Sequence, residues 1–111
     1  MDRFAFGDIL LVDFPFSDGS GSKRRPALVI AHDLEDDLLL ARITSKPRES
    51  PTDARILDWK LSNLLFPSTV RLAKLATLSL TLIEKKIRQL TIMDKTETLA
   101  ALHAFADSLG V

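Results

Sequence analysis

Cysteine is absent from this chain of 111 residues, histidine occurs only twice, and basic and acidic side chains balance at 15 each. Without cysteine the protein has no disulfide, no catalytic thiol and no cysteine-ligated metal, and two histidines far apart in sequence make a poor zinc site. We therefore expect neither a metal nor another cofactor. Because the formal net charge is zero, any contact with nucleic acid must come from local patches of positive charge.

Long apolar runs are absent as well. The apolar run near the N-terminus covers residues 9–12 before Asp13 breaks it, which is too short and too acidic for a signal peptide. No segment is long enough to span a membrane, so we expect a cytoplasmic protein with no membrane contact. Hydrophobic residues still make up 46% of the sequence, which is enough for a packed core, and the length predicts one domain over residues 1–111.

Short apolar segments divided by turn-forming residues predict an antiparallel β fold. Residues 77–80 are expected to be a link, and residues 82–90 fit either a short helix or an irregular strand. Because strands and helices do not alternate, the pattern favours a mainly β protein, a small antiparallel barrel with one packed helix at its C-terminal end. The five predicted strands are residues 9–14, 27–31, 38–44, 55–60 and 69–75.

The C-terminal helix has the clearest signature. Asp94 is predicted to cap its start, and Glu97 three residues later completes a capping box. Four apolar residues then recur at helical spacing, and they predict the stripe that packs on the sheet. They are Leu99, Leu102, Ala106 and Leu109.

A basic triplet follows a loop of small polar residues between the first two predicted strands. The loop covers residues 17–22, beginning with Ser17, and it is expected to be mobile or tightly turned. Lys23, Arg24 and Arg25 come next, directly before the second strand. Three cations at the mouth of a rigid strand can bind a phosphate in a fixed geometry. The alternative is a solvated turn whose charges only keep the sheet edge soluble.

Three sequence blocks follow one another along most of the chain. The first joins Gly7-Asp8-Ile9 to the segment RPALVI, residues 25–30. The second is Ile43-Thr44-Ser45, and the third covers residues 68–78 together with residues 86–90. In this order and spacing, the blocks resemble the MazF/PemK family of toxins from bacterial toxin–antitoxin pairs, and the third block is similar to a PemK-like subgroup.

The resemblance implies an SH3-like barrel, a homodimer, and a metal-independent endoribonuclease that cuts single-stranded RNA at specific sequences. It also implies a cognate antitoxin whose disordered, acidic C-terminal tail occupies the RNA groove. The family's catalytic arginine and threonine correspond to Arg25 and Thr44. The residues expected to contact RNA around them are Ser17, Lys23, Arg24, Ser45, Lys46, Arg71 and Lys74.

The residue types at these two positions suit such a reaction. RNA can use its own 2′-OH as the nucleophile, which gives a 2′,3′-cyclic phosphate and a free 5′-OH. The enzyme must then supply proton transfer and donors aimed at the charged phosphorane. Arg25 offers a planar fork of donors, and Thr44 offers one hydroxyl. Arginine holds its proton tightly, so its role as a donor is better founded than a role as a base.

The chain departs from the better-known ribonuclease members along the expected RNA groove. Lys74 and Ala76 stand where many members carry glutamine and arginine, and Ser20-Gly21 stands near the place of an acidic loop residue. Arg71 and Lys74 are expected either to replace the missing arginine as phosphate contacts or to be ordinary charges on an exposed strand face. Two alternatives stay open: a non-catalytic member that binds RNA or an antitoxin, and a gyrase-inhibiting toxin of the same fold.

Overall fold

The protein is built mainly of antiparallel strands. The computed structural model describes residues 4–16, 18–46 and 49–110. Within these ranges it has six strands, one 3₁₀ turn and one α-helix. In chain order they are β1 (Asp8–Pro15), β2 (Ser22–Leu34), β3 (Asp37–Thr44), β4 (Asp53–Ile56), β5 (Ser68–Ser79), η1 (Leu80–Leu82), β6 (Ile83–Gln89) and α1 (Ile92–Asp107).

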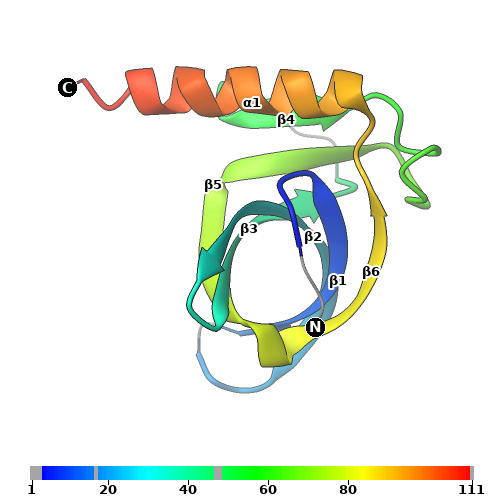
Figure 1. The fold of residues 1–111 in the computed structure, drawn as a ribbon, viewed down its shortest axis with the longest axis vertical. Coiled ribbons are helices and arrows are strands. Elements are labelled where there is room, and N and C mark those ends of the chain that lie inside the picture. Colours follow the sequence, from blue (N-terminus) through cyan, green and yellow to red (C-terminus); the bar gives the residue numbers. More distant parts are fainter. Residues whose placement is uncertain (1–3, 17, 47–48, 111) are drawn as a thin grey trace.

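The strands form one curled sheet in the order β4-β5-β3-β2-β1-β6. Every neighbouring pair is antiparallel. Seen end-on, β1, β2, β3, β5 and β6 curl into a ring, and α1 lies outside it along one side, next to β4 and the bent β5 (Figure 1). The predicted mainly β, antiparallel barrel with one C-terminal helix is confirmed.

A corner in β5 lets this strand serve two parts of the sheet. Arg42 of β3 lies opposite Arg71, whereas the preceding Ala41 lies opposite Leu75, so residues 72–74 of β5 have no partner in β3. Extra residues of this kind bend a strand and increase its twist. The part of β5 before the corner pairs with β4, and the part after it follows the wall of the ring (Figure 1).

The second strand begins earlier than predicted. β2 starts at Ser22, and its first half pairs with β1 alone, because pairing with β3 begins only at Ala27. Pro26 lies opposite Leu11 of β1, just before that point. A proline is tolerated there because it faces no ladder on the β3 side. The basic triplet is therefore part of a strand and not the end of a loop.

Three other predicted bounds also change. The fourth strand ends at Ile56, because the backbone N–H groups of Leu57 and Asp58 donate to a side chain of α1 instead of a neighbouring strand. Residues 77–79, predicted as a link, extend β5 because they pair with β3. Residues 83–89 form β6, so the choice between helix and strand is resolved in favour of the strand.

The sheet buries apolar side chains on both of its faces. Successive side chains of a strand point to opposite faces, so a strand that is covered on both sides reads as a continuous apolar run. The inner face of the ring buries Leu10, Val12, Phe14, Ala27, Val29, Leu38 and Leu40. The outer face, against which α1 packs, buries Ile9, Leu28, Ala41, Ile43, Ala54, Ile56, Val70, Leu72 and Leu90.

The Gly7-Asp8 pair of the first sequence block has an architectural role. Gly7 has a φ of 95°, and its carbonyl accepts the N–H of Leu90 at 2.8 Å. A Cβ at this position would lie 2.6 Å from Cε of Lys95, so only glycine fits without adjustment. The side chain of Asp8 is 4% exposed and forms an ion pair of 3.1 Å with Lys86 of β6. Together the two residues fasten the start of β1 to the middle of β6 and to Leu90, directly after that strand.

Asp94 fixes how α1 sits on the sheet. Its side chain is buried, and its carboxylate oxygens accept the N–H groups of Leu57 at 3.0 Å and Asp58 at 2.9 Å. The N-cap of the helix is Thr91, whose Oγ1 accepts the N–H of Asp94 at 3.3 Å. The prediction that Asp94 is the cap was therefore wrong by three residues, because its carboxylate bonds to the loop after β4.

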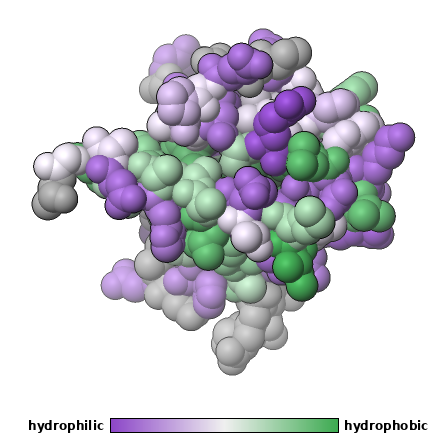
Figure 2. All heavy atoms as spheres, turned by 90° about the horizontal axis from the view of Figure 1, so that it is seen from above, coloured by the Kyte–Doolittle hydropathy of each residue, from purple (hydrophilic) through white to green (hydrophobic). Residues whose placement is uncertain are grey.

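The buried side of α1 also differs from the predicted apolar stripe. Thr98 is fully buried and Leu102 packs against the core, whereas Leu99 is 47% and Leu109 is 64% exposed. Ala106 is exposed as well. The two bonds to the Asp94 carboxylate set the rotation of the helix, so several apolar side chains remain in solvent. Figure 2 shows such apolar side chains among polar ones on this face.

We expect Asp94→Ala to lower the free energy of unfolding by about 2–3 kcal/mol, because two partly buried N–H groups lose a charged acceptor. Asp107→Ala, at the exposed end of the same helix, is the control and should change it by less than about 0.5 kcal/mol. Urea denaturation followed by circular dichroism measures both. Equal values for the two variants would contradict the role given to Asp94.

Candidate nucleic-acid interface

Charged side chains line up on the inner face of the sheet, beyond the apolar core. Residues opposite each other in neighbouring strands share a face. Asp53 lies opposite Arg71, Arg71 lies opposite Arg42, and Arg42 lies opposite Ala27. Arg25 lies two residues before Ala27 on β2 and points to the same side. Four adjacent strands therefore form one row of charges, the charged row, which consists of Asp53, Arg71, Arg42 and Arg25.

Arg25 and Thr44 lie at the same end of adjacent strands. Each is two residues beyond the Ala27–Arg42 pair, Arg25 before Ala27 and Thr44 after Arg42. Because side chains alternate along a strand, both face the inner side of the sheet. Both are partly buried, and both line one groove of about 370 Å³. The structure thus brings together the two residues that were predicted to be catalytic.

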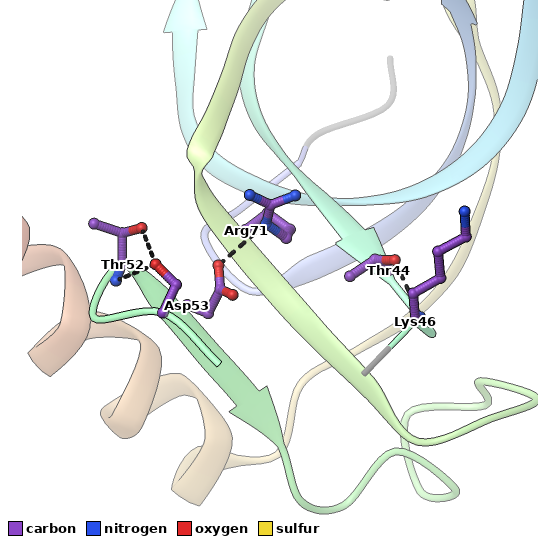
Figure 3. A network of polar contacts seen from close by, with 6 residues as sticks. Thr44, Lys46, Thr52, Asp53 and Arg71 are labelled. Atoms are coloured by element: carbon purple, nitrogen blue, oxygen red, sulfur yellow. Dashed lines mark hydrogen bonds and ion pairs between the residues drawn. The ribbon is translucent and has the colours of Figure 1, made fainter. Parts of the chain in front are cut away.

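The groove that Arg25 and Thr44 share, the threonine groove, also gathers other predicted RNA contacts. Leu65 and Phe66 from the loop before β5 line it as well, and they are 84% and 61% exposed. Oγ1 of Thr44 accepts the backbone N–H of Lys46 at 3.2 Å (Figure 3). This bond uses an oxygen lone pair, so the hydroxyl proton can be donated to a ligand. The predicted contacts in the groove are Lys23, Arg24, Ser45 and Lys46.

Two further grooves adjoin the threonine groove. The arginine groove, of about 340 Å³, shares Arg25 with it. The tryptophan groove, of about 430 Å³, shares Ser45 and Lys46 with it and includes Trp59. Arg25 therefore lies between the threonine groove and the arginine groove, and Ser45 and Lys46 lie between the threonine groove and the tryptophan groove. Charged and aromatic residues of the arginine groove are Phe14, Phe16, Arg25, Arg42 and Lys74.

Arg71 does not lie on an exposed face, contrary to the sequence prediction. Its Nε donates to Oδ1 of Asp53 at 3.2 Å, and the two side chains are 14% and 4% exposed. Figure 3 shows the Arg71 side chain joined to Asp53 of β4 by this contact. The register places this carboxylate directly opposite Arg71, and Arg71 lines none of the three grooves. Lys74, at the corner of β5, is exposed as expected.

Arg42 belongs to this interface, although the sequence prediction missed it. Partial burial lowers the pKa of its guanidinium, and the positive charges of Arg25 and Arg71 lower that pKa further. In sequence, Arg42 is a single polar residue in the apolar segment LLLARIT. The available signal was its place two residues before Thr44, which puts both side chains on one face of a strand.

The basic triplet is divided between the two faces of β2. Lys23 and Arg25 point to one side of the strand and Arg24 points to the other. Nε of Arg24 pairs with Oε2 of Glu84 on β6 at 3.0 Å, and the arginine side chain is 68% exposed. Such an exposed pair adds little stability, so a ligand can compete for Arg24. The three cations are not equivalent, because Arg25 alone is partly buried.

The loop between β1 and β2 is tightly turned where the structure describes it. The N–H of Phe16 donates to the carbonyl of Gly21 at 2.8 Å, and that of Gly19 donates to Phe16 at 3.0 Å. The hydroxyl and the backbone N–H of Ser20 both donate to the carboxylate of Asp18, which lowers its pKa. Ser17, a predicted RNA contact, lies outside the described residues.

Residues 4–16, 18–46 and 49–110 contain neither a cluster of metal ligands nor a membrane-spanning helix. No group of three or more histidine, aspartate or glutamate side chains in these ranges is arranged to hold a metal ion. No helix there is long and apolar enough to cross a membrane.

Replacing one partner of the Asp53–Arg71 ion pair should destabilise the protein more than replacing both partners. Asp53→Asn leaves Arg71 without a counter-charge beside Arg42, so the free energy of unfolding should fall by about 2–4 kcal/mol. The double variant Asp53→Asn/Arg71→Met should lose less, with a coupling energy of about 1.5–3 kcal/mol between the two sites. Urea denaturation of the wild type, both single variants and the double variant measures this cycle. Additive losses would mean that the pair is not coupled.

Comparison with known proteins identifies a family. A family model described as "PemK-like, MazF-like toxin of type II toxin-antitoxin system" matches residues 5–106. No curated protein matches the chain.

Several solved structures share the fold. The chain is similar to the Mycobacterium tuberculosis toxin MazF-mt6, with 19% identity over 90% of this chain and 96% of that one, and a TM-score of 0.75. It is similar to an endoribonuclease from Mycobacterial species (16% identity, 94% and 91% covered, TM-score 0.72). A third structure is an endoribonuclease in complex with its cognate antitoxin from Mycobacterial species (17% identity, 92% and 93% covered, TM-score 0.71). Since the family model spans nearly the whole chain, the protein belongs to the PemK-like, MazF-like toxins of type II toxin–antitoxin systems.

Proposed function

We propose that this toxin is a metal-independent endoribonuclease that cuts single-stranded RNA at specific sequences and so inhibits translation and growth. The observation that carries the proposal is the shared groove of Arg25 and Thr44, two donors suited to phosphate on adjacent strands. Two of the similar structures are endoribonucleases, which supports the same activity here. Its substrate would be messenger RNA, and the toxin would act in the cytoplasm.

The reaction needs no nucleophile from the protein. The 2′-oxygen of the RNA attacks the adjacent phosphorus and the bond from phosphorus to O5′ breaks, which leaves a 2′,3′-cyclic phosphate and a 5′-OH. The 2′-OH loses its proton to water, and O5′ gains one. RNA is the substrate because DNA lacks the attacking hydroxyl. The protein therefore has to hold the phosphodiester, stabilise the charge that develops on it and assist proton transfer.

Arg25 and Thr44 divide these tasks. The guanidinium of Arg25 presents parallel N–H donors to the non-bridging oxygens of the phosphorane. It also gives a proton to O5′ as that oxygen leaves, and it regains one from the water that took the 2′ proton. Thr44 donates its hydroxyl proton to a non-bridging oxygen, while Lys46 holds the hydroxyl oxygen in place through its backbone N–H. Lys23 and Arg24, at the rim of the same groove, attract the flanking phosphates.

The charge of the grooves also suits an antitoxin. An acidic, partly apolar tail would place carboxylates on Lys23, Arg24 and Arg25 and apolar side chains on Leu65 and Phe66, which line the same groove and are exposed. It would then compete with RNA for the same cations. A similar protein was solved with its cognate antitoxin, which supports such a partner here. We propose a homodimer as the active form, in keeping with the family.

The activity assay uses a fluorescent single-stranded RNA whose sequence comes from mapping the cuts made in total RNA. Arg25→Ala should lower kcat/KM by about 10²–10³-fold and Thr44→Val by about tenfold, because losing a charged donor costs more than losing a neutral one. Arg88→Ala, which removes an exposed charge outside the grooves, is the control and should stay within about twofold. EDTA should not change the rate.

The cleavage products and a modified substrate test the proposed mechanism further. Mass spectrometry should find a 2′,3′-cyclic phosphate, and a single 2′-deoxynucleotide on the 5′ side of the cut should block cleavage. Cleavage that EDTA abolishes, or full activity in Arg25→Ala, would overturn the mechanism. Growth arrest that persists in both Arg25→Ala and Thr44→Val would favour a non-catalytic or gyrase-inhibiting toxin.

Binding of an acidic antitoxin tail should depend strongly on salt, because it rests on ion pairs at an exposed surface. The dissociation constant of a synthetic peptide carrying the antitoxin's C-terminal sequence should rise about tenfold or more between 50 and 300 mM NaCl. Isothermal calorimetry measures it, and the same peptide should inhibit RNA cleavage competitively. An affinity that does not change with salt would count against the shared binding site.

A further inference from the structure

Three arginines on three adjacent strands are neutralised unequally. Arg71 and Arg42 lie directly opposite each other, and Arg25 lies on the same face of the next strand. Arg71 is paired with the buried carboxylate of Asp53. Within the described residues, no carboxylate pairs with Arg42 or with Arg25. Two partly buried guanidinium groups therefore face one groove without an acidic partner.

Such an arrangement is costly unless an anion completes it. Removing a charge from water is unfavourable, and like charges close together add to the cost. The lowered pKa of Arg42 reflects both effects, since burial is its main cause and the charges of Arg25 and Arg71 add to it. Functional sites commonly retain groups that would be unfavourable in a purely structural role. The missing counter-charge thus points to a ligand.

The arginine groove indicates what kind of anion fits. Arg42 supplies a planar fork of donors, which matches a phosphate, and the exposed ammonium of Lys74 lines the same groove. Phe16, 43% exposed, lines it as well and offers an aromatic surface on which a base can stack. Cations beside an exposed ring favour a nucleotide over an isolated carboxylate.

We propose that Arg42, assisted by Lys74, binds a second phosphate of the RNA strand in the arginine groove, next to the scissile phosphate held by Arg25 and Thr44. This inference rests on the proposed function. Arg25 lines both grooves and so lies between the two phosphate positions. Arg42 does not touch the reacting atoms; it contacts the substrate and fixes which part of the strand enters the threonine groove.

The test uses Arg42→Met, which removes the positive charge and leaves an unbranched apolar side chain in its place. Arg88→Met is the matched control. The probe is a single-stranded RNA with every 2′-OH methylated, so that it binds without being cut. Arg42→Met should weaken binding about tenfold at 100 mM NaCl and make the slope of log K against log[salt] shallower by about 0.7, the value for one phosphate contact on a single strand. Arg88→Met should change neither quantity.

A methylphosphonate scan identifies the contact itself. One phosphate of the probe at a time is replaced by an uncharged methylphosphonate. One replacement, next to the scissile position, should weaken binding to the wild type and leave binding to Arg42→Met unchanged. The inference would be overturned if every methylphosphonate weakened binding to Arg42→Met as much as it weakens binding to the wild type. Equal affinity of Arg42→Met and the wild type for the unmodified probe would also overturn it. So would a variant that loses affinity for an acidic peptide but not for RNA.

Two further readouts separate this inference from a structural role and from the proposed function. Arg42→Met should unfold at the wild-type temperature or above it, and a drop of more than about 5 °C would mark Arg42 as a structural residue and overturn the inference. In cleavage assays the variant should raise KM and keep kcat, unlike Arg25→Ala. A wild type that binds the methylated probe through Arg42 but cuts no RNA would refute the proposed function and leave this site standing.

Discussion

Backbone register is the constraint on which the proposed site depends. The β2–β3 and β3–β5 pairings place Ala27, Arg42 and Arg71 in one line across the sheet, and residues two positions along share the same face. Arg25 and Thr44 come together for that reason alone, although they are 19 positions apart in the sequence. A shift of one residue would turn each of these side chains to the opposite face. The relative positions of the two proposed catalytic side chains therefore depend on how the strands pair.

The corner of β5 makes this register compatible with the strong curl of the sheet. Three unpaired residues, 72–74, let the strand turn from β4 toward the wall of the ring. Before the corner, β5 brings Arg71 to Asp53, which removes one positive charge from the row. At the corner itself, Lys74 lines the groove beside Arg42. One irregularity thus separates Arg71, which is paired with Asp53, from Lys74, which lines the arginine groove.

Much of the fold could be predicted from the sequence, because apolar runs and turn residues report strand positions directly. The antiparallel class and the strands β1, β3 and β5 follow from such local patterns. The rotation of α1 could not be predicted, because it depends on the bonds from Leu57 and Asp58 to Asp94, 36 or more positions away. The apolar periodicity of the helix indicated a different face, and the tertiary hydrogen bonds prevailed.

The candidate site was predictable to a similar degree. Arg25 and Thr44 were found through a family resemblance, and the structure places them on one groove. The burial of Arg71 was missed, because nothing local links it to Asp53, 18 residues earlier. Arg42 was missed because a lone arginine within an apolar strand reads as a solvent-facing position. Both errors concern charges, whose environment is set by residues on other strands.

Nuclear magnetic resonance of the arginine side chains tests the central claim most directly. The Nε–H signals of Arg25, Arg42 and Arg71 are followed while the methylated single-stranded RNA is added. The register and the buried ion pair predict that the signals of Arg25 and Arg42 shift together and that the signal of Arg71 stays in place. A shift of the Arg71 signal with Arg25 unmoved would contradict this account of the site.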